Sequence, residues 1–133
     1  MNGSDAHMNT AWWALRIGLG VGPILAGLDK FFNILTDWTM YLNPLATKIT
    51  HLSAPTFMHI VGLIEILAGI LVLTRFTRIA SAVVTAWLVA IALNLVTMGM
   101  FYDLAVRDIE IAVAAFALFQ LSTARDARAM VRN

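Results

Sequence analysis

Residues 55–73, PTFMHIVGLIEILAGILVL, and residues 79–100, IASAVVTAWLVAIALNLVTMGM, are two apolar stretches separated by five residues that include two arginines. About 20 mostly apolar residues are enough for an α-helix to cross the hydrocarbon core of a bilayer. Because the link between the stretches is so short, the two helices must be antiparallel neighbours. The centre of the sequence therefore predicts a membrane-spanning helical hairpin.

Two further apolar stretches flank this hairpin, at residues 12–32 and 105–121. Of the 133 residues, 60% are hydrophobic and 13% are charged, whereas a soluble domain has about 25% charged residues. A soluble fold of this size could not bury so much apolar side chain, which excludes an ordinary soluble enzyme. A disordered protein is excluded too, and the net charge of +1 argues against nucleic-acid binding. We predict an all-α polytopic membrane protein: a four-transmembrane-helix bundle over residues 12–122, with a polar N-terminal tail (1–11) and a basic C-terminal tail (123–133).

The long link between the first and second spans, residues 33–54, has apolar residues at helical spacing. This pattern favours helices that lie in the plane of the membrane interface. Asn43 and Pro44 form a helix start signal, an N-cap followed by proline at the first helical position. Ser53 and Pro55 form a similar signal for the second span. We therefore expect an interfacial helical segment that is divided near Asn43.

Basic residues are distributed unevenly between the two ends of the predicted spans. With four spans, one side holds Arg16, Arg75, Arg78, Arg125, Arg128 and Arg132, and the other holds Lys30, Lys48 and Arg107. Because basic residues concentrate on the cytoplasmic side, we expect both termini to be cytoplasmic, with the protein in the bacterial inner membrane. Trp38 and Tyr41 would then belong to the aromatic belt at the outer surface.

Small residues recur every four positions on two of the spans, and helices in lipid associate through such residues. One set is Ala14, Gly18, Gly22 and Ala26, and the other is Ala82, Ala86, Ala90 and Asn94. Gly62 and Gly69 flank Glu65 on the second span. Each set could contact a partner protein, but we expect most of them to lie at contacts within the bundle.

Glu65 is the polar residue whose burial costs the most free energy. It lies ten residues into the second span, about 15 Å deep in the membrane. A charge near the bilayer centre costs about 2.5–3.5 kcal/mol, so it must be paired, neutral or hydrated. Arg16 lies about 6 Å inside the predicted cytoplasmic surface, and its long side chain can reach further into the membrane. The sequence allows a buried Arg16–Glu65 ion pair or a protonated Glu65, and does not decide between them.

A second polar group gathers near the predicted outer surface. Its members are Asp29, Lys30, His59, Asn94, Arg107 and Asp108. Arg107 also has the helical spacing to pair with Asp103 and Glu110. One interpretation is an ion-pair network that fixes helix register. The other is a cavity that binds a polar head group or moves protons, and we lean slightly toward the structural interpretation.

Metal and thiol chemistry have little support in the sequence. The chain contains no cysteine, which excludes disulfides, thiolate metal sites and a thiol nucleophile. His51 and His59 could bind a metal, but isolated histidines are more often hydrogen-bonded side chains. We expect no metal site and assign no catalytic residue.

Several short motifs together resemble those of the DoxX-like family. They are Arg16 with Gly18, Gly27-Leu28-Asp29-Lys30, Glu65 with Gly69, and Asn94 followed by Tyr102-Asp103 and Arg107-Asp108. The likeness extends over residues 12–122. It implies a small four-helix integral membrane protein, and one branch of the family is similar to a subunit of a thiosulfate:quinone oxidoreductase. It therefore implies a redox context and leaves quinone binding open.

Two functions remain in competition. The first is a non-catalytic accessory subunit that packs in a larger membrane complex, for which electron transfer is the favoured context. The second is a membrane oxidoreductase component that binds a quinone or another lipophile at the outer polar group. The expected partners are the lipid bilayer and other membrane subunits, with no nucleic acid. A quinone is the one cofactor that the sequence leaves open.

Overall fold

The computed structural model describes residues 3–133, and this part of the chain is helical with no strands. The first two residues of the expected polar tail lie outside the described range, and the rest of that tail is helical. The elements are α1 (Gly3–Phe32), the 3₁₀ helix η1 (Trp38–Tyr41), α2 (Pro44–Thr50), α3 (Ala54–Val72), α4 (Thr77–Thr97) and α5 (Tyr102–Arg132).

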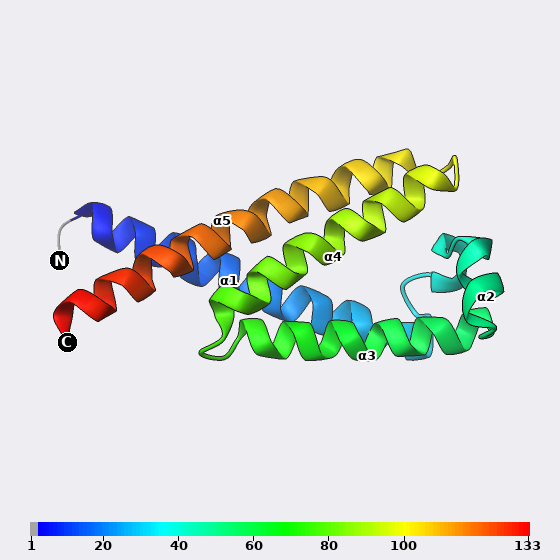
Figure 1. Ribbon diagram of the computed structural model, residues 1–133, viewed down its shortest axis with the longest axis horizontal. Helices are drawn as coiled ribbons and strands as arrows, with labels where there is room; N and C mark the ends of the chain where they lie inside the picture. The colour runs from blue at the N-terminus through cyan, green and yellow to red at the C-terminus, as the bar shows by residue number, and fades with distance from the viewer. Residues whose placement is uncertain (1–2) are drawn as a thin grey trace.

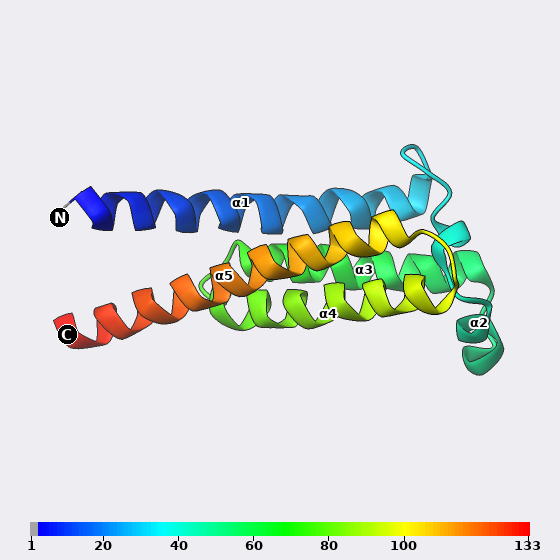
Figure 2. The same cartoon turned by 90° about the horizontal axis from the view of Figure 1, so that it is seen from above.

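Both helix start signals in the link are confirmed. The Asn43 side chain accepts a hydrogen bond from the Leu45 backbone N–H, and Pro44 opens α2. Ser53 caps α3 by accepting from the Thr56 backbone N–H at 3.3 Å. Local capping thus sets where these helices begin, and η1 and α2 form a cap over one end of the molecule (Figure 2).

The helices form two antiparallel pairs. α1 packs along α3 and α4 packs along α5, whereas contacts between α3 and α4 and between α1 and α5 are fewer. Figure 1 shows the two pairs crossing near the α3–α4 link and diverging toward the end that carries α2. Both chain ends lie at the opposite end of the molecule (Figures 1 and 2). The expected bundle is therefore more open than four evenly packed helices.

Glycines bring α1 and α3 into close contact. A Cβ atom at Gly27 would lie 2.5 Å from the Gly62 carbonyl oxygen, and one at Gly69 would collide with the Gly20 carbonyl oxygen. The two glycines on each helix are seven residues apart, so they lie on one face two turns apart. Gly62 and Gly69 therefore form the predicted packing face of α3, and close backbone approach explains why the side chains must be absent.

The prediction for the other small-residue sets was wrong. In the described chain no atom of another element lies within 4 Å of a Cβ atom built at Gly18 or Gly22. Ala82, Ala86 and Ala90 are exposed as well. The physical reason is that α1 meets α3 through the face of Gly20 and Gly27, which is turned away from Gly18 and Gly22.

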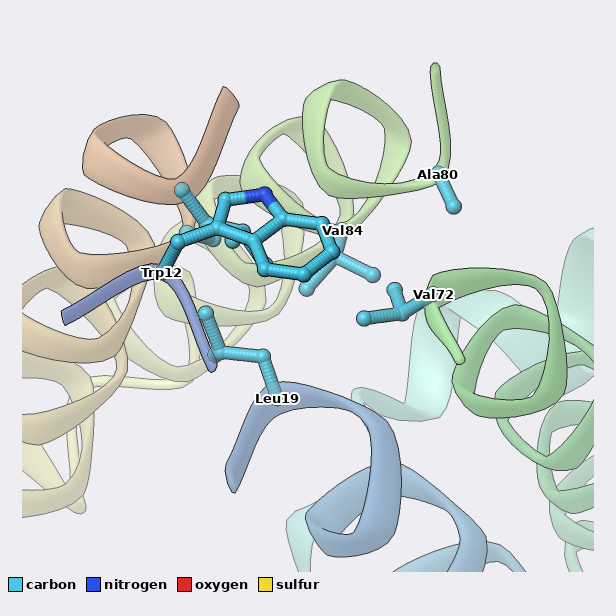
Figure 3. Packing of buried hydrophobic residues seen from close by; sticks show 7 residues of the cluster. Trp12, Leu19, Val72, Ala80 and Val84 are labelled. Carbon is cyan, nitrogen blue, oxygen red and sulfur yellow. The ribbon is translucent and has the colours of Figure 1, made fainter. Parts of the chain in front are cut away.

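The main hydrophobic core lies where the two pairs cross (Figure 3). It contains Trp12, Leu19, Val72, Ala80, Val84, Ala115 and Leu118. The Trp12 indole N–H donates a 2.9 Å hydrogen bond to Ser122 Oγ in this buried region. Nearer the chain ends, Arg128 pairs with Asp5 at 2.7 Å. These contacts join the first half of α1 to the last half of α5.

Three helices in the described range are long and apolar enough to cross a membrane: α1, α3 and α4. The predicted spans 55–73 and 79–100 correspond to α3 and α4 within three residues, and the predicted span 12–32 is the later part of α1, which begins nine residues earlier at Gly3. The fourth predicted span, 105–121, is the apolar middle of α5, whose two ends carry charged residues. The structure thus establishes an all-helical fold with three candidate spans, and the four-span bundle stays a prediction.

Candidate functional site

A buried ion pair joins α1 to α3. Lys30 Nζ lies 2.6 Å from Glu65 Oε2, and the two side chains are 5% and 10% exposed. Lys30 is in the last turn of α1 and extends toward the middle of α3. Because an unpaired charge among apolar helices is very costly, each partner makes the other tolerable.

Of the two alternatives that the sequence left open, the Arg16–Glu65 pair is wrong, because Glu65 pairs with Lys30. Arg16 instead donates hydrogen bonds to the carbonyl oxygens that end α3, namely those of Val72, Leu73 and Thr74, at 2.7–3.2 Å. The glycine contacts explain this, because Gly20 faces Gly69. Arg16 precedes Gly20 by one turn and so meets the C-terminal end of α3, while Glu65 lies one turn from Gly69 in the other direction. The two are thus about 12 Å apart along the helix axis.

The link after α1 folds back over Lys30. The Nζ atom of Lys30 is 3.7 Å from the centre of the Trp38 ring, a cation–π contact. Asp29, which is buried, accepts hydrogen bonds from Trp38 Nε1 at 2.8 Å and from the backbone N–H groups of Ile34 and Leu35 at 3.0 Å each. Asp29 thus holds η1 in place, and Trp38 completes the surroundings of the ion pair.

Two residues from the other helix pair approach the ion pair. Trp87 of α4 lies beside the Glu65 carboxylate, which its buried indole N–H approaches without full hydrogen-bond geometry. Asp108 of α5 is half-buried and close enough to both Lys30 and Glu65 for electrostatic interaction. The site therefore combines one cation, two carboxylates and one indole N–H donor.

The other predicted members have separate roles. The Asn94 side chain bonds to the link, donating to the Tyr41 carbonyl oxygen at 2.8 Å and accepting from Asn43 N–H at 3.4 Å. His59 is stacked on the Phe31 ring at 4.8 Å between ring centres. Arg107 is exposed, and within residues 3–133 it forms no ion pair with Asp103 or Glu110. The expected pairs of Arg107 with Asp103 and Glu110 are therefore absent from the described chain, although Arg107 is close enough to Asp108 for electrostatic attraction.

A cavity of about 430 Å³ lies next to the ion pair. Its lining comes from the end of α1, the link and the first turns of α3: Lys30, Asn33, Asp37, Thr39, Pro55, Met58 and His59. Of the predicted site residues, Lys30 and His59 line it and Asp29 supports its wall. Asn94, Arg107 and Asp108 do not line it. Whether the cavity binds a ligand stays a prediction.

Sequence reasoning missed the two tryptophans and the lining from the link. Trp38 was interpreted as part of an aromatic belt, and its spacing from Asp29 gives no sign of a hydrogen bond. Asn33 has a positive φ of 51°, a conformation that asparagine tolerates better than most residues. An asparagine directly after the first span was therefore the signal in the sequence for a sharp turn that brings the chain back over Lys30.

The DoxX family model matches residues 11–99 of this chain. That range is two thirds of the sequence and contains α3, α4 and most of α1. The chain belongs to the DoxX family. The match includes Lys30, Glu65 and the cavity lining, and it ends before α5, so the likeness over residues 100–122 remains a resemblance. No curated protein and no solved structure gives a match to this DoxX chain.

Family membership and the three apolar helices both indicate that the protein lies in a membrane. This DoxX chain is a small integral membrane protein, and its surface fits that environment, since large apolar side chains are exposed along all of the long helices. Within the described residues no group of three or more histidine, aspartate or glutamate side chains could hold a metal ion.

Proposed function

We propose that this protein is an accessory subunit that packs against a larger membrane protein complex. The observation that carries the proposal is the unused small-residue face of α1. Gly18 and Gly22 leave space for close helix approach and contact no other element in the described chain. Because such faces associate in lipid through backbone contact, a transmembrane helix of another protein is a suitable occupant. An electron-transfer complex is our preferred context, on the strength of the family resemblance alone.

The proposed membrane arrangement has four crossings in the bacterial inner membrane. α5 would be the fourth, with residues 105–121 in the hydrocarbon core and both termini in the cytoplasm. Two observations support this: α5 packs along α4 for much of its length, and both chain ends lie at one end of the molecule. The uneven distribution of basic residues supports the orientation.

Co-purification from native membranes tests the accessory role. We expect the wild-type chain to purify in mild detergent with a larger membrane protein at fixed stoichiometry. Gly18→Leu should weaken that association, because its new side chain occupies the open face without touching the chain's own packing. Ile17→Leu, a change at an exposed position on a different face of α1, is the matched control. A chain that purifies alone, or a Gly18→Leu variant that still co-purifies fully, would contradict the proposal.

A second candidate function rests on the cavity beside Lys30. We propose as the alternative that it receives the polar head of a quinone or a similar lipophile. Lys30 Nζ and the His59 ring could donate hydrogen bonds to a carbonyl oxygen of the quinone. The nearby carboxylates could exchange protons with the quinone oxygens. The location near the end of the apolar helices is suited to a ligand with a long hydrocarbon tail.

Binding of a short-chain quinone analogue separates the two candidates. The alternative predicts saturable binding to the wild-type protein in detergent and several-fold weaker binding to His59→Ala, which lines the cavity. His51→Ala is the control, because His51 is exposed and lies outside the lining. Equal binding to both variants, or none to the wild type, would remove the alternative and leave the accessory role.

A further inference from the structure

A second cavity, about 470 Å³ in volume, lies between α3 and α4 next to the link that joins them. Its apolar lining repeats the same helical spacing on each helix: Ile64, Leu67, Ala68 and Leu71 from α3, and Phe76, Ile79, Ala80 and Val83 from α4. Seven residues of helix correspond to about 10 Å. The lining therefore forms an apolar groove that begins at the link and runs along the hairpin.

This groove opens toward the membrane. Leu67, Ile79 and Val83 are each more than half exposed in the described chain. Their bulky side chains make a poor surface for another helix, since helices in lipid approach through small residues. A flexible hydrocarbon chain can follow such an uneven groove. The shape thus favours an acyl chain over a protein helix.

A basic residue marks the link end of the groove. The Arg75 guanidinium lies 5.0 Å from the centre of the Phe76 ring, and Phe76 lines the groove. Arg75 is exposed and makes no ion pair within residues 3–133. Arg78 is also exposed but lies 4.0 Å from Asp126, so part of its charge is balanced. Arg75 is therefore the cation best placed to meet an anion at this position.

We propose that this groove binds an anionic diacyl phospholipid, with an acyl chain between α3 and α4 and the phosphate beside Arg75. The short link between two membrane-crossing helices must lie at the membrane surface, at the level of the head groups. An acyl chain that enters the groove there brings its phosphate to Arg75. A zwitterionic lipid would make the same apolar contacts with the groove. Its electrostatic attraction to Arg75 would be weaker, because its head group carries no net charge.

Native mass spectrometry of the full chain in mild detergent tests this proposal. The probes are phosphatidylglycerol and phosphatidylcholine with identical acyl chains. We expect phosphatidylglycerol to be retained preferentially. Arg75→Gln should weaken its binding about fivefold, since a basic residue beside an anionic lipid surface contributes about 1 kcal/mol. Arg132→Gln, which changes an exposed arginine in the last turn of α5, should leave binding unchanged.

A second pair of variants tests the groove separately from the charge. Val83→Trp places a large ring in the groove and should lower retention of both lipids, whereas Val113→Trp, at an exposed position of α5, should not. Equal retention of both lipids by the wild type would overturn the proposal. Equal losses in Arg75→Gln and Arg132→Gln would also overturn it, because they would indicate diffuse attraction to basic residues.

Discussion

The Lys30 ammonium and the Glu65 carboxylate meet 2.6 Å apart in the contact between α1 and α3. Each comes from a helix that is apolar on most of its surface, and the two side chains are almost fully buried, although Lys30 also lines the neighbouring cavity. The pair is enclosed by Trp38 from the link and approached by Trp87 and Asp108 from the other helix pair. All four long helices contribute polar or aromatic groups to this site.

Removing one partner of this ion pair should lower the stability of the protein far more than removing both partners. Glu65→Leu leaves a buried Lys30 without a counter-charge, and the free energy of unfolding should fall by about 3–5 kcal/mol. The double variant Lys30→Met with Glu65→Leu should recover most of that loss, because apolar residues of similar volume replace the pair. Thermal unfolding in one detergent measures all three proteins. A double variant as unstable as the single one would show that the charges are not coupled.

The glycine contacts predict a sharp contrast between two equal substitutions on α1. Gly27→Leu forces a Cβ atom against the Gly62 carbonyl oxygen and should destabilise the protein by about 1–3 kcal/mol. Gly18→Leu adds the same side chain to an open face and should change stability by about 0.5 kcal/mol or less. Unfolding of both variants under the same conditions provides the comparison. Equal destabilisation would mean that α1 and α3 do not meet through Gly27.

The hydrogen bond from Trp38 to Asp29 should hold the link in place. Trp38→Phe keeps an aromatic ring over Lys30 but removes the indole N–H, a donor to a charged group worth about 1.5–3 kcal/mol. The amides of Ile34 and Leu35 also bond to Asp29, so their hydrogen exchange should become roughly tenfold or more faster. Trp13→Phe, an exposed tryptophan at the other end of α1, serves as the control. Unchanged exchange at residues 34 and 35 would rule out this role for Trp38.

The proposed membrane topology can be measured by cysteine labelling, because the sequence contains no cysteine of its own. Single cysteines at Thr47 and at Arg128 should be labelled by an impermeant reagent from opposite sides of the membrane. The Arg128 position should react from the cytoplasmic side, since it belongs to the more basic end. Labelling of both positions from the same side would contradict the four-crossing arrangement.

The features that could be predicted from sequence are those set by local chemistry. The three apolar helices follow from length and composition, and the starts of α2 and α3 follow from Asn43 and Ser53, whose capping bonds lie within three residues. Gly62 and Gly69 were assigned to the correct face because they flank a buried carboxylate. Each of these predictions needs no knowledge of which helix lies opposite.

The errors arise where the register between helices decides the outcome. Counting residues gave plausible depths for Arg16 and Glu65, but the Gly20–Gly69 contact places Arg16 at the end of α3. Lys30 was assigned to the membrane surface by its position, although its long side chain reaches inward to Glu65. Small residues at four-residue spacing predicted a packing surface on one face of α1, whereas α1 packs on α3 through a different face.

The central claim is that the open Gly18 and Gly22 face of α1 contacts another membrane protein. A photoreactive amino acid at Gly22 in native membranes tests this contact, with the same group at Ile17, an exposed position more than a quarter turn away from that face, as the control. We expect a discrete crosslink to a larger membrane protein from position 22 and none from position 17. Crosslinks from position 22 to lipid alone, or to a second copy of this chain, would contradict it.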